Sequence, residues 1–205
     1  MNVLEVETAF GPARIHLRPV ERPRAALVLG HGAGGGVAAR DLAAATAAAH
    51  AERVTAALVE QPYRVAGRRS PAPAHQLDAA WLAVIDRLRR RELRGLALVV
   101  GGRSSGARVA CRTAAASGAI GVLCLAFPLR PPRREGSAPA PSRLPELDAV
   151  TLPVLVVQGS NDRFGIPPSG DRRKVVEVAG DHSLRTDLAA VNAAVQMWLA
   201  ELCGP

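Results

Sequence analysis

Short apolar segments and longer helical segments alternate along most of the chain. Residues 25–29 run apolar without a polar interruption into a cluster of glycines, as a strand covered on both faces does. Comparable short segments recur further along the sequence, each separated from the next by a longer segment. We predict strands at 25–29, 54–59, 96–100, 120–127, 153–157 and 174–178.

The segments between these strands have the character of helices. Residues 37–51 are rich in alanine and contain no Gly or Pro, and residues 75–93 carry apolar side chains at helical spacing. Because strands alternate with helices, the sequence predicts an α/β fold with a mostly parallel, doubly wound sheet. The predicted helices are 37–51, 75–93, 104–117 and 183–202.

Two segments depart from this alternation. Residues 3–8 and 13–17 alternate apolar and polar positions around a turn at Gly11, which is typical of an antiparallel hairpin at a sheet edge. Residues 130–145 are rich in Pro, Arg and Ser, which predicts a loop too short to bury a core of its own. We therefore expect one domain, residues 1–205, with no cap domain over its active site.

Charge and composition bear on the class of partner. The net charge of +8 and the isoelectric point near 11 would suit a phosphate-binding surface. However, Lys174 is the only lysine and alanine is abundant, as a GC-rich coding bias would produce. Aromatic residues make up only 3% of the chain, which leaves few platforms for stacking bases. We predict no nucleic-acid partner.

Hydropathy and cysteine usage bear on location and on metal binding. The sequence has no run of eighteen apolar residues and no basic and apolar leader at its start, so we expect a cytoplasmic protein with no membrane partner. An odd set of cysteines without Cys-x-x-Cys spacing is typical of reduced core thiols. No metal site and no cofactor are predicted. The cysteines are Cys111, Cys124 and Cys203.

The strongest motif is Gly102-Arg103-Ser104-Ser105-Gly106, a G-x-S-x-G sequence between a predicted strand and a predicted helix. A serine at such a turn adopts a strained backbone conformation, so its flanking residues must be small enough to let strand and helix approach. Gly102 and Gly106 meet that requirement for Ser104. Ser105 does not meet it, because Arg103 would be one of its flanking residues. The motif therefore predicts Ser104 as a nucleophile.

A general base and an acid follow the nucleophile in the sequence. A serine hydroxyl is a poor nucleophile until a base takes its proton, and the base needs a group that orients it. Asp162 follows the predicted strand 153–157, and His182 follows the predicted strand 174–178. The carboxyl ends of parallel strands meet at one edge of the sheet, and serine, acid and histidine stand in α/β-hydrolase order. We predict His182 as the base and Asp162 as its orienting acid.

Other histidines and carboxylates have simpler structural interpretations. Asp181 adjoins His182, but neighbouring side chains on a turn rarely meet with the geometry that a triad needs, so Asp162 is favoured. Asp171 is favoured even less than Asp181 as the acid. Surface, helix-end or loop-shaping positions are expected for His16, His31, His50 and His75.

The glycine-rich segment 31–36 follows the predicted strand 25–29. In α/β-hydrolases this loop donates one backbone N–H to the oxyanion, and the residue after the nucleophile donates the other. We predict Ser105 and Ala33 as these donors, with Gly34 as the second choice in the loop. A phosphate cradle is disfavoured, because neither the Walker sequence nor the Rossmann glycine spacing is present.

Six segments of this sequence together resemble a dienelactone-hydrolase-like family. More narrowly, the chain is similar to a small bacterial group related to a eukaryotic non-specific-lethal complex subunit and to testis-expressed proteins. The resemblance spans about 25–202 and implies a cap-less α/β-hydrolase fold with the triad assigned above. Two positions depart from the family pattern, Ser105 and Gln61. The segments are His31-Gly32-Ala33-Gly34-Gly35, Gln61-Pro62-Tyr63, Gly67-Arg68-Arg69, Gly101-Gly102-Arg103-Ser104-Ser105-Gly106, Gln158-Gly159-Ser160-Asn161-Asp162 and Asp181-His182-Ser183.

These residues predict a serine hydrolase that cleaves a small ester or thioester through an acyl-enzyme on Ser104. Tyr63 and Arg103 are expected to contact the small acyl substrate. The alternative is a non-catalytic interaction module of the same fold, which an intact nucleophile, base, acid and oxyanion loop disfavours. The sequence does not indicate an oligomeric state. Further arginines near the predicted site would suit an anionic substrate, but with arginine so abundant, ordinary solvated surface is the favoured interpretation for most of them: Arg64, Arg68, Arg69 and Arg130.

Overall fold

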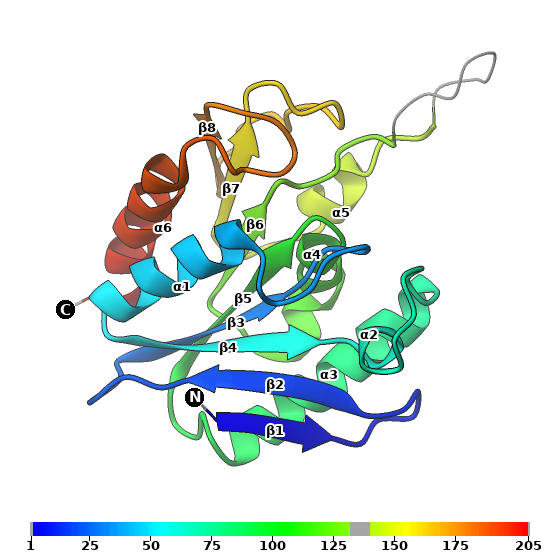
Figure 1. Cartoon of the computed structure of the whole chain (residues 1–205). Helices are drawn as coiled ribbons and strands as arrows, with labels where there is room; N and C mark the ends of the chain where they lie inside the picture. Colours follow the sequence, from blue (N-terminus) through cyan, green and yellow to red (C-terminus); the bar gives the residue numbers. More distant parts are fainter. Residues whose placement is uncertain (1, 132–139, 205) are drawn as a thin grey trace.

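The chain folds around one sheet of eight strands in the order β1-β2-β4-β3-β5-β6-β7-β8 (Figure 1). The computed structural model describes residues 2–131 and 140–204. β1 pairs antiparallel with β2, and β2 pairs antiparallel with β4. The remaining strand pairs are parallel. The strands are β1 Asn2–Val6, β2 Ala13–Arg18, β3 Ala25–Gly30, β4 Val54–Glu60, β5 Ala97–Arg103, β6 Gly121–Leu125, β7 Val154–Gly159 and β8 Arg173–Val178.

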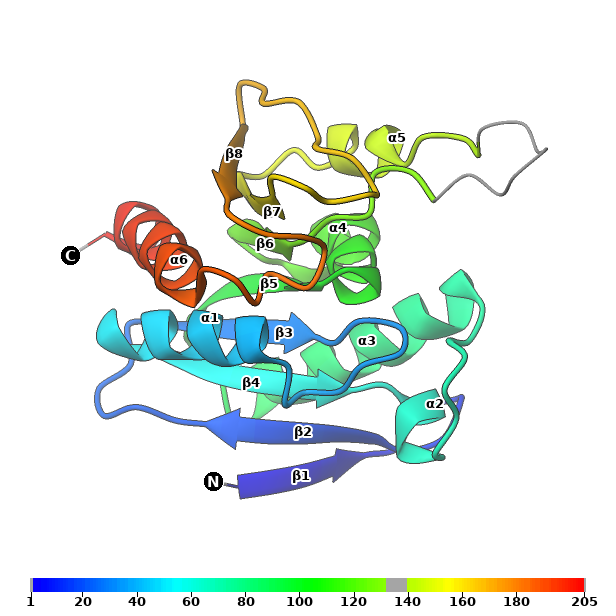
Figure 2. The same cartoon turned by 45° about the horizontal axis from the view of Figure 1, so that its top comes forward.

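Helices cover both faces of this sheet (Figure 2). α1 and α6 pack against each other over one face, and α3, α4 and α5 pack over the other. α2 follows β4 directly, beside the hairpin of β1 and β2. The helices are α1 Arg40–Ala51, α2 Pro62–Val65, α3 Ala74–Arg90, α4 Ser105–Ser117, α5 Leu144–Asp148 and α6 Leu188–Cys203.

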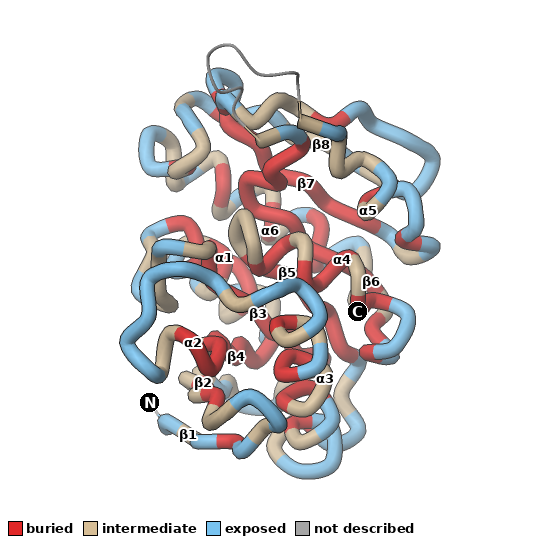
Figure 3. Tube along the Cα trace, turned by 90° about the vertical axis from the view of Figure 1, so that its right-hand side faces the viewer, coloured by how far each residue is buried: buried red, intermediate tan, exposed pale blue. Residues whose placement is uncertain are grey.

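The uninterrupted apolar strands result from burial on both faces. Every residue of β3 is buried, and successive side chains of a strand point to opposite faces of the sheet. Ala26 and Val28 belong to the core beneath α3 and α4, whereas Leu27 and Leu29 belong to the core beneath α1 and α6. Burial is concentrated in the centre of the molecule, and exposed positions lie mostly in the loops (Figure 3). The predicted doubly wound sheet with its antiparallel edge hairpin is confirmed.

The last helix begins later than its amphipathic pattern predicts. The predicted start at Ser183 is wrong, because α6 begins at Leu188. Asp187 caps this helix, since its side chain accepts a hydrogen bond of 2.9 Å from the Ala190 N–H. The residues before the cap therefore form a loop at the carboxyl end of β8. α1 likewise begins later than predicted, at Arg40, and the short α2 was not predicted.

The connection from β6 to α5 is too short for a cap domain. It occupies residues 126–143, of which the structure describes 126–131 and 140–143. The centre of the predicted Pro-rich loop, residues 132–139, lies outside the described residues, and α5 begins at its far end, at Leu144. None of the helices in the described parts of the chain combines the length and the apolar character that crossing a bilayer requires.

Candidate active site

Ser104 lies on a sharp turn between the end of β5 and the start of α4. Its backbone has φ 53° and ψ −107°, the strained conformation expected of the turn. The approach of strand and helix leaves no room for side chains at the flanking glycines. A Cβ on Gly102 would lie 2.6 Å from the Gly30 carbonyl oxygen, and a Cβ on Gly106 would also collide with the Gly30 backbone. The predicted requirement for glycine on both sides of Ser104 is therefore a consequence of backbone packing.

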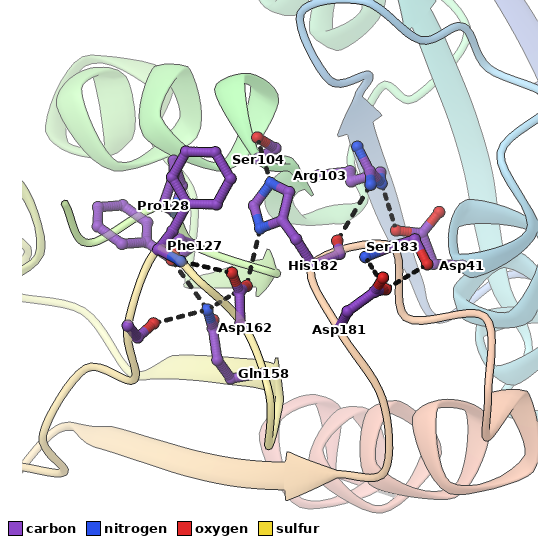
Figure 4. A network of polar contacts seen from close by, with 12 residues as sticks. Asp41, Arg103, Ser104, Phe127, Pro128, Gln158, Asp162, Asp181, His182 and Ser183 are labelled. Atoms are coloured by element: carbon purple, nitrogen blue, oxygen red, sulfur yellow. Dashed lines mark hydrogen bonds and ion pairs between the residues drawn. The ribbon is translucent and has the colours of Figure 1, made fainter. Parts of the chain in front are cut away.

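Three loops bring the predicted triad residues into one hydrogen-bonded chain (Figure 4). The Ser104 Oγ lies 2.9 Å from His182 Nε2, and His182 Nδ1 lies 2.7 Å from Asp162 Oδ2. A carboxylate only accepts hydrogen bonds, so Nδ1 carries the proton and Nε2 is left to accept from the serine hydroxyl. This tautomer is the one that general-base catalysis by an imidazole requires. The arrangement could therefore activate a serine hydroxyl.

The Asp162 carboxylate is buried and fully engaged. Besides the bond from His182, Oδ2 accepts a hydrogen bond of 2.7 Å from Gln158 Nε2, and Oδ1 accepts one of 2.9 Å from the Phe164 N–H. Gln158 Nε2 also lies 3.1 Å from the Phe127 carbonyl and 3.0 Å from the Gly165 carbonyl. Since all three neighbours of Nε2 are acceptors, the orientation of the Gln158 amide is determined by its surroundings. Sequence reasoning missed Gln158, although a lone polar residue in the apolar strand β7 was the available signal.

The rival carboxylate, Asp181, has a different role in the structure. Its Oδ1 accepts hydrogen bonds from the N–H and the hydroxyl of Ser183, at 2.8 and 2.6 Å. These bonds lower the pKa of Asp181, which lies on the exposed turn beside the histidine. The side chain of Asp181 thus stabilises its own turn, while the carboxylate that contacts His182 is Asp162.

His31 shapes the glycine-rich loop after β3. Its Nε2 accepts a hydrogen bond of 3.1 Å from the Gln61 N–H, and its Nδ1 donates one of 2.8 Å to the Gly32 carbonyl. Burial lowers the pKa of His31, which favours the neutral imidazole that this accepting role needs.

The other histidines form contacts outside the triad: His16 with Glu60, His50 with the Arg18 carbonyl and His75 with the ring of Phe10.

The same loop packs directly on the turn that carries Ser104. A Cβ on Gly32 would lie 3.6 Å from the Ser104 Cβ, so the loop approaches the nucleophile closely. The hydroxyl of Tyr63 donates a hydrogen bond of 2.8 Å to the Ala33 carbonyl and so anchors the loop from α2. Ser105 begins α4, where backbone N–H groups and the helix dipole favour negative charge. The assignment of Ala33 and Ser105 as oxyanion donors stays a prediction that these placements allow.

The two residues predicted to contact substrate are both engaged by the protein itself. Tyr63 is only 2% exposed, and burial raises the pKa of its hydroxyl to about 12. Arg103 pairs with Asp41 and donates to the backbone carbonyl of His182. Substrate contact by either residue stays a prediction.

Phe164 forms part of the wall beside the base. Its ring centroid lies 4.2 Å from that of His182 at an interplanar angle of 40°, so the two rings pack together. The guanidinium of Arg163 lies over the Phe164 ring, 5.4 Å from its centroid. The sequence carried no clear signal for Phe164, because its contact depends on how the loop after β7 meets the loop after β8.

The site contains acid-base groups rather than a metal-ligand cluster. Within residues 2–131 and 140–204, no three His, Cys, Asp or Glu side chains gather closely enough to hold a metal ion. A cavity of about 360 Å³ is lined by residues of α4, α5 and the segment that follows α5, and none of the triad residues lines it. The chemistry of this site is therefore that of a serine hydroxyl, an imidazole and a carboxylate.

Comparison with known proteins agrees with this geometry. A sequence model of one family, described as an alpha/beta hydrolase domain, matches residues 23–193. The chain belongs to this alpha/beta hydrolase family. The matched residues include all three members of the hydrogen-bonded chain, Ser104, Asp162 and His182. No curated protein sequence matches the chain.

Solved alpha/beta hydrolases share the fold at low sequence identity. A serine hydrolase without a lid from Xanthomonas campestris is 17% identical, with a TM-score of 0.76 over 98% of this chain and 94% of that one. Est1E from Butyrivibrio proteoclasticus is 16% identical, with a TM-score of 0.78 over 98% and 99%. A dienelactone hydrolase from Anabaena variabilis is 14% identical, with a TM-score of 0.73 over 98% and 97%. The predicted cap-less hydrolase fold is confirmed, and hydrolase activity in general is supported.

Proposed function

We propose that this chain is a serine hydrolase that cleaves a small ester or thioester through an acyl-enzyme on Ser104. The observation that carries the proposal is the continuous contact from Ser104 Oγ to His182 Nε2 and from His182 Nδ1 to Asp162, at 2.9 and 2.7 Å. These distances lie within the range of direct proton transfer between a nucleophile and its base.

In the proposed reaction, Ser104 Oγ attacks the acyl carbonyl carbon while His182 Nε2 accepts the hydroxyl proton. The negative oxygen of the tetrahedral intermediate accepts hydrogen bonds from the N–H groups of Ala33 and Ser105. His182 then gives its proton to the departing alcohol or thiol, which leaves the acyl group on Ser104. Water then gives a proton to His182 and attacks the acyl carbon; the bond to Ser104 Oγ breaks, the carboxylic acid leaves, and His182 returns the proton to Oγ. The Asp162 carboxylate stabilises the imidazolium in both halves of the reaction. The cycle needs no cofactor.

The connection between β6 and α5 bears on access to the site. It is too short to form a cap domain, so a small acyl compound can reach Ser104 without the movement of a cap. The resemblance of the glycine-loop, nucleophile, acid and histidine segments supports a place in the bacterial group related to the non-specific-lethal complex subunit. We expect the activity to be cytoplasmic and to involve neither nucleic acid nor a membrane.

Labelling with a fluorophosphonate probe tests the proposal. Wild-type protein should become covalently labelled, and Ser104→Ala should abolish the labelling. Ser169→Ala is a matched control, because Ser169 is an exposed serine in the loop before β8 and its loss should leave labelling unchanged. Folding of each variant is checked by thermal unfolding.

Two outcomes would contradict the proposal. A well-folded wild-type protein that is not labelled and hydrolyses nothing in an ester, thioester and lactone panel would favour the non-catalytic interaction module. Labelling that persists in Ser104→Ala would show that another nucleophile reacts. The panel should include a feruloyl ester, because Est1E has been observed with ferulic acid bound.

A further inference from the structure

Arg103 joins three segments that surround the proposed nucleophile. It is the last residue of β5, directly before Ser104. Its Nε lies 2.9 Å from Asp41 Oδ2, and its Nη2 donates a hydrogen bond of 3.0 Å to the His182 carbonyl. A Cβ on Gly32 would lie 2.7 Å from Nη1, so the guanidinium also packs against the glycine-rich loop. Figure 4 shows the contacts of Arg103 with Asp41 and with the His182 carbonyl. One side chain thus contacts the segments that carry the base and the predicted oxyanion donor.

Asp41 holds the guanidinium in this position from the first turn of α1. Its side chain is only 1% exposed, and Oδ1 accepts a hydrogen bond of 3.0 Å from the Leu42 N–H. Burial raises the pKa of Asp41, whereas the charge of Arg103 acts to lower it. Charged groups are rarely buried unless they are paired. The Arg103–Asp41 ion pair is therefore a different kind of contact from the ion pairs of solvated arginines on the surface.

The His182 loop, between β8 and α6, contacts neighbouring segments on two sides. It follows β8, which lies at the edge of the sheet. The Asn161 N–H donates a hydrogen bond of 2.9 Å to the Gly180 carbonyl and so joins this loop to the loop of the acid. Arg103 provides the contact on the opposite side, between the His182 backbone and the strand that carries the nucleophile.

We propose that Arg103, anchored by Asp41, is a positioning residue that holds the His182 backbone so that the imidazole reaches Ser104. The inference deepens the proposed function and rests on it. A displacement of about 1 Å in a reacting group can lower a rate about 100-fold, so the position of this backbone matters for turnover. Arg103 acts through His182 and does not itself contact the reacting atoms.

The alternative role for Arg103 is the binding of an anionic substrate. Its side chain is 19% exposed, and its nitrogens already contact a carboxylate, a carbonyl and a glycine. A substrate carboxylate would have to displace Asp41 or share the guanidinium with it. The two roles predict different kinetics, because a positioning residue affects kcat for every substrate whereas a binding residue affects KM for anionic ones.

Steady-state kinetics of Arg103→Met separates these roles with two esters of similar size, one neutral and one carrying a carboxylate. We expect kcat to fall at least about 10-fold for both esters, with little change in either KM. Arg103→Lys keeps the charge but offers one nitrogen, so it should recover only part of kcat. Asp41→Asn should lower kcat in the same direction, and Asp41→Asn combined with Arg103→Met should be no slower than Arg103→Met alone.

Arg112→Met is the matched control. Arg112 lies on α4 with a side chain 20% exposed, close to the 19% of Arg103, and it donates two hydrogen bonds to Asp78 at 2.8 and 2.6 Å. Its loss removes a comparable ion pair away from the triad. We expect Arg112→Met to lower the melting temperature while leaving kcat unchanged.

A measurement that needs no turnover keeps the inference separate from the proposed function. The proton shared by His182 and Asp162 should give a downfield imidazole resonance in ¹H NMR, assigned by its loss in His182→Ala. The resonance should broaden or vanish in Arg103→Met and persist in Arg112→Met. If Arg103→Met does not fold, Arg103→Lys and Asp41→Asn are measured in the same way.

The possible failures are distinguishable. Wild-type protein that is neither labelled nor active would overturn the proposed function. The NMR comparison would still test whether Arg103 positions the His182 imidazole. Active wild type with unchanged kcat and an unchanged resonance in the Arg103 and Asp41 variants would overturn the inference. A rise in KM confined to the anionic ester would instead assign Arg103 to substrate binding.

Discussion

Gln158 Nε2 donates a hydrogen bond of 2.7 Å to Oδ2 of Asp162, the same oxygen that accepts from His182 Nδ1. Two donors therefore converge on one carboxylate oxygen, and Gln158 is itself fully buried. Because Nε2 also lies within hydrogen-bond distance of the Phe127 and Gly165 carbonyls, the amide links the acid to the segment after β6 and to the loop after β7. Gln158, together with the Phe164 N–H, therefore holds the acid where it meets the imidazole.

Replacing Gln158 with leucine should impair both catalysis and stability. The substitution removes the donor to Asp162 and leaves two buried carbonyl groups without it, which should cost about 1–3 kcal/mol of unfolding free energy. We expect a lower kcat at nearly unchanged KM, measured by ester hydrolysis, and a lower midpoint of urea unfolding. Gln196→Leu is the control, because Gln196 bonds to Glu52 away from the site. Wild-type turnover in Gln158→Leu would contradict this role.

Replacing each of the two candidate acids by asparagine should affect kcat very differently. Asp162→Asn keeps the shape of the side chain but favours the wrong imidazole tautomer, so kcat should fall by about 10⁴-fold. Asp181→Asn alters only an exposed turn and should leave kcat unchanged. Steady-state hydrolysis of one ester by both variants is the measurement. A larger loss in Asp181→Asn than in Asp162→Asn would overturn the assignment of the acid.

Tyr63 is the only tyrosine in the chain, so its ionisation can be followed without interference. Burial raises the pKa of its hydroxyl to about 12, whereas an exposed tyrosine ionises near pH 10. The phenolate absorbance should therefore appear about two pH units later in folded protein than in urea-unfolded protein. Since the unfolded state loses its proton first, the stability that neutral Tyr63 contributes should decrease as the pH rises from about 10 to about 12.

Tyr63→Phe provides the matching variant for this measurement. It removes the hydrogen bond to the Ala33 carbonyl, which anchors the glycine-rich loop beside Ser104. We expect a loss of about 1 kcal/mol of stability at neutral pH and a reduced kcat, and the tyrosine-dependent part of the alkaline destabilisation should disappear. A phenolate titration near pH 10 in the folded protein would contradict the buried placement of Tyr63.

The order and type of most elements could be predicted because the signals are local. A strand covered on both faces must be apolar throughout, as β3 is, and a nucleophile turn must have glycine where strand and helix backbones approach, as at Gly102 and Gly106. The start of α6 was predicted too early because a local capping residue was overlooked. The amphipathic segment that ends in α6 continues towards Ser183, but Asp187 caps the helix and leaves the preceding residues to the loop.

Local patterns in the sequence were enough to predict the doubly wound sheet, the turn at Ser104 and a short set of residues able to act with it. The sequence also favoured Asp162 over Asp181 as the acid. The contacts of Gln158 with Asp162 and of Arg103 with Asp41 became visible only in the folded chain. The difference comes from the sequence separation over which each effect acts. Periodicity and backbone sterics act over a few residues, whereas these contacts join side chains from separate loops whose distances depend on the packing of the whole sheet.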